Sequence, residues 1–151
     1  MIKTAVALIA ALAALALASG AAALPPGGPP AIRGAKVAPP PAWIAVGGRS
    51  AWLAFGSTCW KTSCIDFIPP PMRKDVPTVT AARGAVARLH FGFQPTKVTV
   101  AWITEDGLSK ATALTAARVT RWKLGKSGLA VIAARPPSAG EATYLVRVRL
   151  A

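Results

Sequence analysis

The sequence predicts an all-β fold, an immunoglobulin-like antiparallel β-sandwich of about seven strands, over residues 43–151. Three observations favour it. Short apolar runs alternate with polar residues, Gly and Pro separate these runs, and five Trp and four Phe supply a core. The region is long enough for one domain of ordinary size. A small closed β-barrel is the alternative architecture.

The expected strands follow one another along the chain. The first two bracket Gly47-Gly48, a β-branched run follows the prolines at 69–71, and strict alternation marks several later runs. Turn chemistry is present at 105–107 and 123–128, and 108–117 is expected to be strand or loop. The expected strands are 43–46, 51–55, 76–80, 87–93, 98–102, 115–124, 129–134 and 144–150.

Residues 1–23 are predicted to be a secretory signal peptide. Lys3 provides the positive start, an apolar run covers 5–18, and small residues then offer cleavage at Gly20 or Ala23. An uncleaved membrane anchor is the alternative, but the run is dominated by Ala and about 20 apolar residues are needed to span a bilayer. We therefore expect a secreted or otherwise extracytoplasmic protein of the cell envelope, with its signal peptide cleaved.

Residues 24–42 are predicted to be a Pro-rich linker. They contain no aromatic residue, and their prolines favour extended, polyproline-like conformers. Such a segment is expected to stay outside the core. It would hold the domain away from a surface or separate it from the export signal.

The two cysteines, Cys59 and Cys64, are predicted to form a structural disulfide. Four residues separate them, so they do not form the Cys-x-x-Cys motif of thiol oxidoreductases, and export places them in an oxidising compartment. So short a loop should contribute about 2 kcal/mol. A metal site is disfavoured because two thiolates and the single His, His90, make a poor zinc site. We expect neither a metal nor a cofactor.

The sequence offers few groups for catalysis. It has one His and five Asp and Glu, and it has no Gly-x-Ser-x-Gly motif. His90 falls in the middle of an expected strand, where an exposed or edge histidine is the expectation. We predict that the protein is not an enzyme. The alternative is a carboxylate-dependent secreted hydrolase, which would gather Asp66, Asp75 or Glu141 beside His90.

The tryptophans and Asp66 have predicted roles. Trp52 and Trp102 continue apolar strand faces and are expected in the core, whereas Trp60 lies inside the cysteine loop. Trp60 is therefore the candidate exposed ring for ligand binding, with packing across the disulfide as the favoured alternative. Asp66 follows the second cysteine directly, and we expect it to be structural, accepting backbone N–H bonds that fix the loop.

The charge of the chain is strongly positive, with 18 Lys and Arg against 5 Asp and Glu. Loss of residues 1–23 removes Lys3 and lowers the net charge only from +13 to +12. Arg147 and Arg149 should share a solvent face, which Arg88 would join if the strands are neighbours. These arginines are candidate binding residues for an anionic envelope polymer or membrane surface. No motif in the sequence would make specific contacts with nucleic-acid bases, so we expect no specific nucleic-acid recognition. A compositional bias of a GC-rich genome is the alternative explanation of the charge.

The segment Gly56-Ser57-Thr58-Cys59-Trp60, with the following Ser63-Cys64-Ile65-Asp66, resembles an element of an uncharacterised group of bacterial secreted proteins and lipoproteins. The runs at 91–95, 98–102 and 140–144 fit the order of motifs in that group. The chain departs from it at Thr58, where an aromatic residue is common, and in lacking a lipid-anchor cysteine. The resemblance implies a disulfide-bearing β-sandwich at the cell envelope and no activity. We therefore expect a non-catalytic binding or accessory module.

Overall fold

The computed structural model describes residues 23–35 and 37–151. The predicted signal peptide lies outside these residues except for its last position, Ala23. Strands dominate the described ranges, which also contain one short 3₁₀ turn, η1 (Pro70–Met72). No helix within these ranges is long and apolar enough to cross a membrane.

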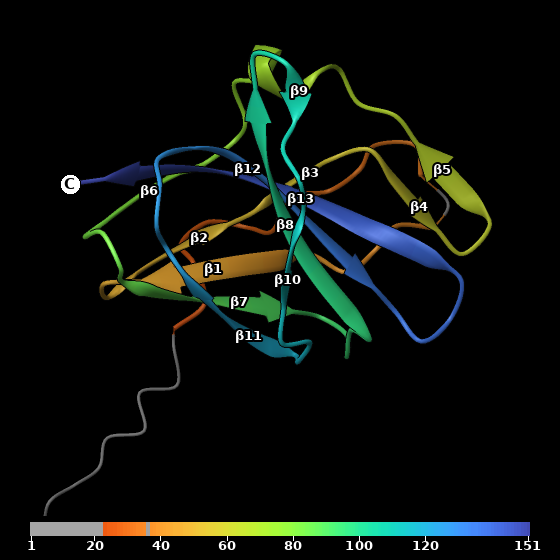
Figure 1. The fold of residues 1–151 in the computed structure, drawn as a ribbon. Coiled ribbons are helices and arrows are strands. Elements are labelled where there is room, and N and C mark those ends of the chain that lie inside the picture. Colours follow the sequence, from red (N-terminus) through yellow and green to blue (C-terminus); the bar gives the residue numbers. More distant parts are fainter. Residues whose placement is uncertain (1–22, 36) are drawn as a thin grey trace, which may run out of the picture.

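The strands form two sheets (Figure 1). In the four-stranded sheet, here called the small sheet, the order is β11-β7-β1-β2; the large sheet has the order β10-β8-β12-β13-β4-β5, with β3 and β6 also paired to β13 and β9 to β8. Their bounds are β1 (Ala42–Val46), β2 (Arg49–Trp52), β3 (Ala54–Phe55), β4 (Thr58–Trp60), β5 (Ser63–Ile65), β6 (Thr78–Ala81), β7 (Val86–Phe91), β8 (Lys97–Thr104), β9 (Gly107–Leu108), β10 (Thr112–Leu114), β11 (Val119–Lys123), β12 (Gly128–Arg135) and β13 (Gly140–Leu150).

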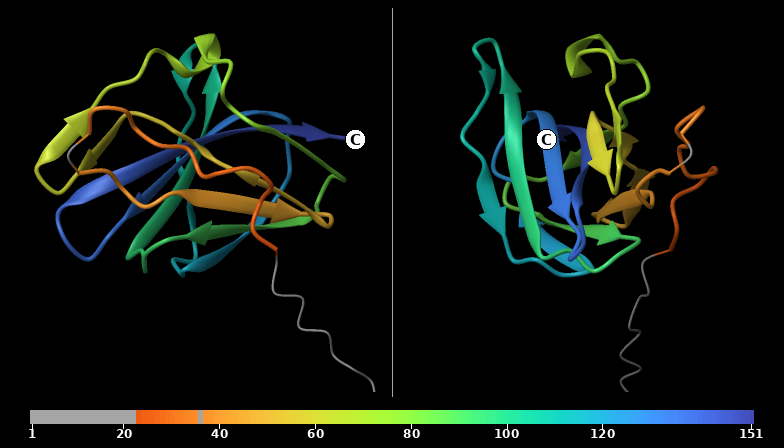
Figure 2. Two further views of the ribbon diagram at one scale, coloured as in Figure 1. Left: turned by 180° about the vertical axis from the view of Figure 1, so that it is seen from behind. Right: turned by 90° about the vertical axis from the view of Figure 1, so that its right-hand side faces the viewer.

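The predicted all-β, largely antiparallel architecture is confirmed. The number of strands is higher than expected because several are only two or three residues long, and β6 pairs with β13 in parallel. The large sheet curls around the core, as the right-hand view of Figure 2 shows. Alternation holds where it was expected: Ala87, Leu89 and Phe91 of β7 are buried, whereas Val86 and Arg88 are exposed.

Strand β13 is the centre of the large sheet. One edge pairs with β12 along residues 142–148. The other edge pairs in succession with β4, β3 and β6. Its Tyr144 is fully buried, and the phenolic hydroxyl donates a hydrogen bond of 2.6 Å to the carbonyl oxygen of Pro40. Burial raises the pKa of Tyr144, so the hydroxyl stays protonated and remains a donor.

The expected strand at 51–55 is divided between the two sheets. Leu53 separates β2 of the small sheet from β3 of the large sheet, and its side chain is fully buried. Its N–H donates to the carbonyl oxygen of Ala42 at 2.9 Å. A local apolar run cannot reveal this crossing, because both halves are equally apolar.

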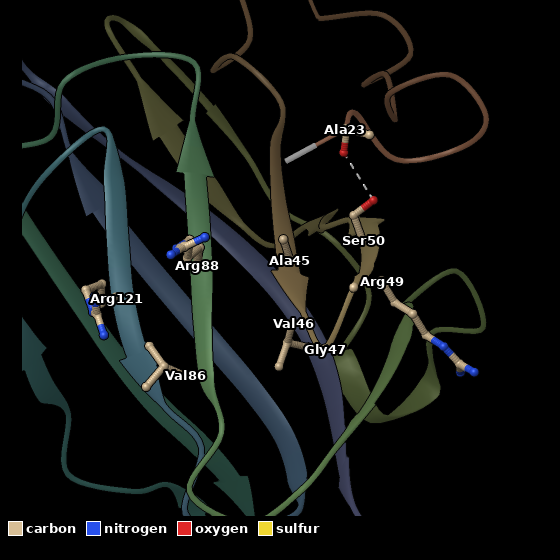
Figure 3. Close-up of a pocket in the computed structure, with 10 residues that line it drawn as sticks. Ala23, Ala45, Val46, Gly47, Arg49, Ser50, Val86, Arg88 and Arg121 are labelled. Carbon is tan, nitrogen blue, oxygen red and sulfur yellow. Dashed lines mark hydrogen bonds between the residues drawn. The ribbon is translucent and has the colours of Figure 1, made fainter. Parts of the chain in front are cut away.

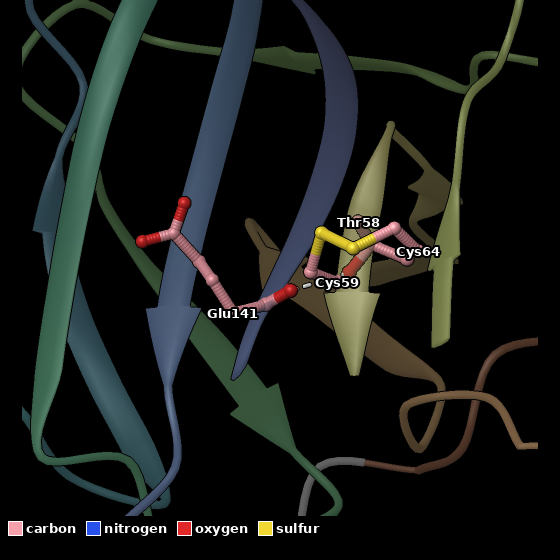
Figure 4. Close-up of a disulfide and its surroundings, with 4 residues drawn as sticks. All are labelled: Thr58, Cys59, Cys64 and Glu141. Atoms are coloured by element: carbon pink, nitrogen blue, oxygen red, sulfur yellow. Dashed lines mark hydrogen bonds between the residues drawn. A yellow bond between two sulfur atoms is a disulfide. The ribbon is translucent and has the colours of Figure 1, made fainter. Parts of the chain in front are cut away.

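The predicted disulfide between Cys59 and Cys64 is confirmed (Figure 4). The two residues face each other across the β4–β5 hairpin, and both are exposed. On the opposite face of β4, the hydroxyl of Thr58 donates to the carbonyl oxygen of Glu141 at 2.5 Å. The hairpin is therefore joined to β13 by side-chain as well as backbone bonds.

The Pro-rich segment differs from an extended linker that stands away from the domain. It lies against the small sheet (orange in Figure 2), with Pro25 and Pro39 buried. The indole N–H of Trp52 donates to the carbonyl oxygen of Gly27 at 3.3 Å, and just before the segment the hydroxyl of Ser50 donates to the carbonyl oxygen of Ala23 at 3.4 Å. The carbonyl oxygen of Pro40, in the same segment, accepts the bond from Tyr144.

Gly140 lies where β13 pairs with the disulfide hairpin, and its substitution tests this contact. It has a φ of +115°, and a Cβ there would lie 2.5 Å from the carbonyl oxygen of Cys59 and 3.1 Å from the nitrogen of Lys61. Because these neighbours are backbone atoms, Gly140→Ala should destabilise the fold by about 2 kcal/mol in urea unfolding. Gly125→Ala is the matched control, with open space around its Cβ and a change within about 0.5 kcal/mol. Equal unfolding midpoints for the two variants would contradict the account.

Candidate functional site

The outward face of the small sheet carries a row of residues that we call the basic row. Arg88 of β7 lies directly opposite Arg121 of β11 in the antiparallel register. Ala45 of β1 and Ser50 of β2 continue the row across the sheet. Because side chains alternate along each strand, these four share one face.

The basic row borders a hollow of about 380 Å³ (Figure 3). Val86 and Arg49 also line it, together with the β1–β2 turn at Gly47-Gly48. The side chains of Arg88 and Arg121 come from neighbouring strands, whereas Figure 3 shows Arg49 directed away from both. Both turn glycines have a positive φ, +57° and +75°, which a two-residue hairpin turn of this type requires.

The basic row is electrostatically uncompensated. Among the described residues, ion pairs join Arg73 to Asp75 and Arg135 to Glu141, and neither includes a member of the row. Like charges directly opposite each other on a sheet destabilise it. The hollow is therefore a site of positive potential that a bound anion would relieve.

An aromatic row lies beside the basic row on the same face. Trp52, Trp43, His90 and Val119 follow one another across β2, β1, β7 and β11. The rings of Trp43 and His90 are stacked, with centroids 3.6 Å apart and planes 2° from parallel. Within the described part of the chain, the buried Nε2 of His90 has no hydrogen-bond partner. Burial, and then the charge of Arg88, lower the pKa of His90.

Arg88 does not join Arg147 and Arg149, because the condition for that grouping, neighbouring strands, is not met. Arg147 and Arg149 lie on β13 of the large sheet, whereas Arg88 lies in the small sheet between β1 and β11. The neighbour of Arg88 is Arg121, which the sequence analysis did not single out. Its signal was the alternation of 119–123, in which Thr120 and Trp122 are buried and Val119, Arg121 and Lys123 are exposed.

Trp60 is not an exposed ring. Only 8% of its surface is exposed, and its ring lies 5.0 Å from that of Phe93. The β4 strand turns Cys59 outward and Trp60 inward, so the ring packs on the core rather than across the disulfide. Trp52 is half-buried under the Pro-rich segment, and Trp102 is half-buried against Trp122 at 5.7 Å between ring centroids.

Asp66 does not have the expected anchoring contacts. It is exposed, and no hydrogen bond to its carboxylate is found among the described residues. The N–H of Phe67 donates instead to the hydroxyl of Ser57 at 3.0 Å. The carboxylate that organises this loop is Asp75, whose pKa is lowered by a hydrogen bond from Arg73.

Arg73 was missed by the sequence analysis. It is 7% exposed, and its guanidinium donates to both carboxylate oxygens of Asp75 and to the carbonyl oxygen of Phe55. It also lies over the ring of Phe67, 4.6 Å from the centroid. These contacts satisfy the buried charge, so Arg73 holds the loop and is not available to a ligand.

The residues of the hydrolase alternative are not gathered in one cleft. Asp66 is exposed, Asp75 and Glu141 are each paired to an arginine, and His90 is stacked on Trp43. The described residues also contain no group of three or more His, Cys, Asp or Glu that could hold a metal ion. The site chemistry that the geometry does assemble is cationic.

Comparison with protein-family models, curated proteins and solved structures found no match to the chain. The resemblance of residues 50–150 to a group of bacterial secreted proteins therefore stays a prediction.

The burial of His90, together with the charge of Arg88, predicts a pH-dependent stability. Because the pKa of His90 is lower in the folded protein, the unfolded chain takes up the proton first as the pH falls. Stability should be constant above about pH 7 and decline as the pH falls below about 6.5. His90→Gln removes the only histidine and should flatten this part of the curve of urea midpoint against pH. An unchanged decline in the variant would contradict the assignment.

Proposed function

We propose that the protein is a secreted, non-catalytic β-domain that acts as an envelope binding or accessory module, and that the basic row binds anionic polymers. The observation that carries the proposal is the direct opposition of Arg88 and Arg121 beside a hollow, without a carboxylate partner in the described residues. Such a pair costs folding stability, so a structural role does not account for it.

The two guanidinium groups suit phosphate, sulfate or carboxylate groups. A guanidinium donates two parallel N–H bonds to such an anion, and it is less strongly hydrated than an ammonium. Directly opposed residues have Cβ atoms about 5 Å apart, so one anionic group can contact both arginines. An anion between them would convert a repulsive pair into two attractive ones.

The binding is expected to be nonspecific and sensitive to salt. The row offers charge without a set of neutral donors and acceptors that would distinguish one polymer from another. The net charge, +13 on the full chain and +12 after loss of residues 1–23, attracts any polyanion from a distance. Affinity should fall as salt rises, because binding releases counterions from the polymer.

The location and the finer architecture are part of the same proposal. The predicted signal peptide and the disulfide both fit an oxidising, extracytoplasmic compartment. The two sheets enclosing one core are compatible with an immunoglobulin-like sandwich, which we retain as the proposed architecture. The curl of the large sheet is the feature that the barrel alternative shares.

Arg121→Thr separates a binding role from a structural one. Removal of one of two opposed cations should raise the free energy of unfolding by up to about 1 kcal/mol, seen as a slightly higher urea midpoint. The same change should weaken binding to dextran sulfate at low salt by about five-fold and lower the slope of log affinity against log salt by about one. Fluorescence anisotropy of a labelled polymer across a salt series measures both quantities.

Arg149→Thr is the matched control, since it removes the same charge from an exposed strand position in the large sheet. It should weaken dextran sulfate binding far less than Arg121→Thr. Equal weakening by the two variants would show that net charge alone attracts the polymer. No binding at low salt, or binding that ignores salt, would overturn the proposed function.

A further inference from the structure

A second cavity lies where the edges of the two sheets approach each other, and we call it the Trp cleft. Its volume is about 410 Å³. Strand β10 ends the large sheet and β11 ends the small one, and the two are not paired with each other. The cleft is lined by Val100, Trp102, Thr112, Leu114, Trp122 and Lys126, among others.

The strand register turns core side chains toward the Trp cleft. Val100 is 2% exposed and Trp122 is 5% exposed, so the cleft reaches the hydrophobic core. Trp102 lies on β8, half-buried, and its ring is tilted by 45° against that of Trp122. Gly128 keeps space for Trp102, because a Cβ there would lie 3.3 Å from the indole ring. The walls of the cleft are therefore apolar and aromatic, and core residues pack behind them.

One cation is held at the rim of the Trp cleft. The ammonium of Lys126 lies 5.1 Å from the ring centroid of Trp102. Neither ion pair of the described residues includes Lys126, and no carboxylate lines the cleft. Lys123 also borders the cleft, but the cation–π contact with Trp102 is made by Lys126, and the Cε of Lys123 lies 3.8 Å from where a Cβ would stand on Gly84.

We propose that the Trp cleft binds a small amphiphilic anion, an apolar body with one acidic headgroup. The body would lie against Trp102, Leu114 and Trp122, and the headgroup would pair with the ammonium of Lys126. Pockets for small molecules are mostly apolar with few polar groups, and this cavity has the size they require. A sugar fits less well, because Thr112 is the one hydroxyl among the lining residues. A cationic amphiphile would be repelled by the positive charge of Lys126.

Isothermal titration of the purified protein with three probes that share a ten-carbon chain tests the proposal. Decanoate, kept below its critical micelle concentration, should bind about five-fold more tightly than decanol, and decyltrimethylammonium should bind most weakly. Lys126→Gln should weaken decanoate binding by about five-fold and leave decanol binding unchanged. Lys97→Gln is the control for charge, since Lys97 is exposed and lines neither cavity.

Two further variants separate this site from the basic row and from general stickiness. Thr112→Trp places a bulky ring at an exposed edge-strand position and should block the cleft without removing core packing. Arg121→Thr should leave decanoate binding unchanged, because Arg121 faces the other side of β11. Equal affinities for decanoate and decanol, or the same effect of Lys126→Gln and Lys97→Gln, would overturn the proposal. Those outcomes would leave dextran sulfate binding by the basic row untouched.

Discussion

The pairing of β13 along both edges is the constraint on which the rest of the structure depends. One edge holds β12, and the other holds β4, β3 and β6 in turn. The β4 pairing places the disulfide hairpin, and the β3 pairing fixes the point at which the chain crosses from the small sheet. Tyr144, in the middle of β13, holds Pro40 and so the residues that lead into β1. The small sheet and its basic row are therefore positioned by a strand that belongs to the other sheet.

The arginines of this chain serve two different physical ends. Arg73 is buried and has a carboxylate, a carbonyl oxygen and an aromatic ring as partners, so its charge is satisfied by the fold. Arg88 and Arg121 are exposed and directly opposite each other, and neither has an ion-pair partner among the described residues, so their charges are available to an anion. A count of basic residues treats the three alike. Only their neighbours show which of them is free to act on a ligand.

Alternation along the sequence predicted the individual strands, whereas the pairing between strands determined which sheet each one belongs to. The strands at 87–93, 98–102 and 144–150 were predicted because each has its own period of two. The placement of β7 in a different sheet from β13 depends on contacts distant in the sequence, so the sequence leaves open whether Arg88 lies beside Arg147 and Arg149. Packing was the favoured prediction for Trp60, but its inward direction toward the core also depends on a distant contact, the pairing of β4 with β13. The disulfide was predictable because a short spacing restricts the geometry by itself.

Strand β11 carries both proposed sites on opposite faces. Arg121 faces outward to the basic row, and its neighbour Trp122 faces inward to the Trp cleft. Although β11 is an edge strand, five register pairs join it to β7, and further backbone bonds connect Leu124 with Ala85 and Phe91 with Arg118 at its two ends. Because the strand is hydrogen-bonded along its length, we expect that an anion bound at one face does not shift the residues of the other face. The period of two thus lets one strand present a cation to water and an indole to the core, with each surface open to change without the other.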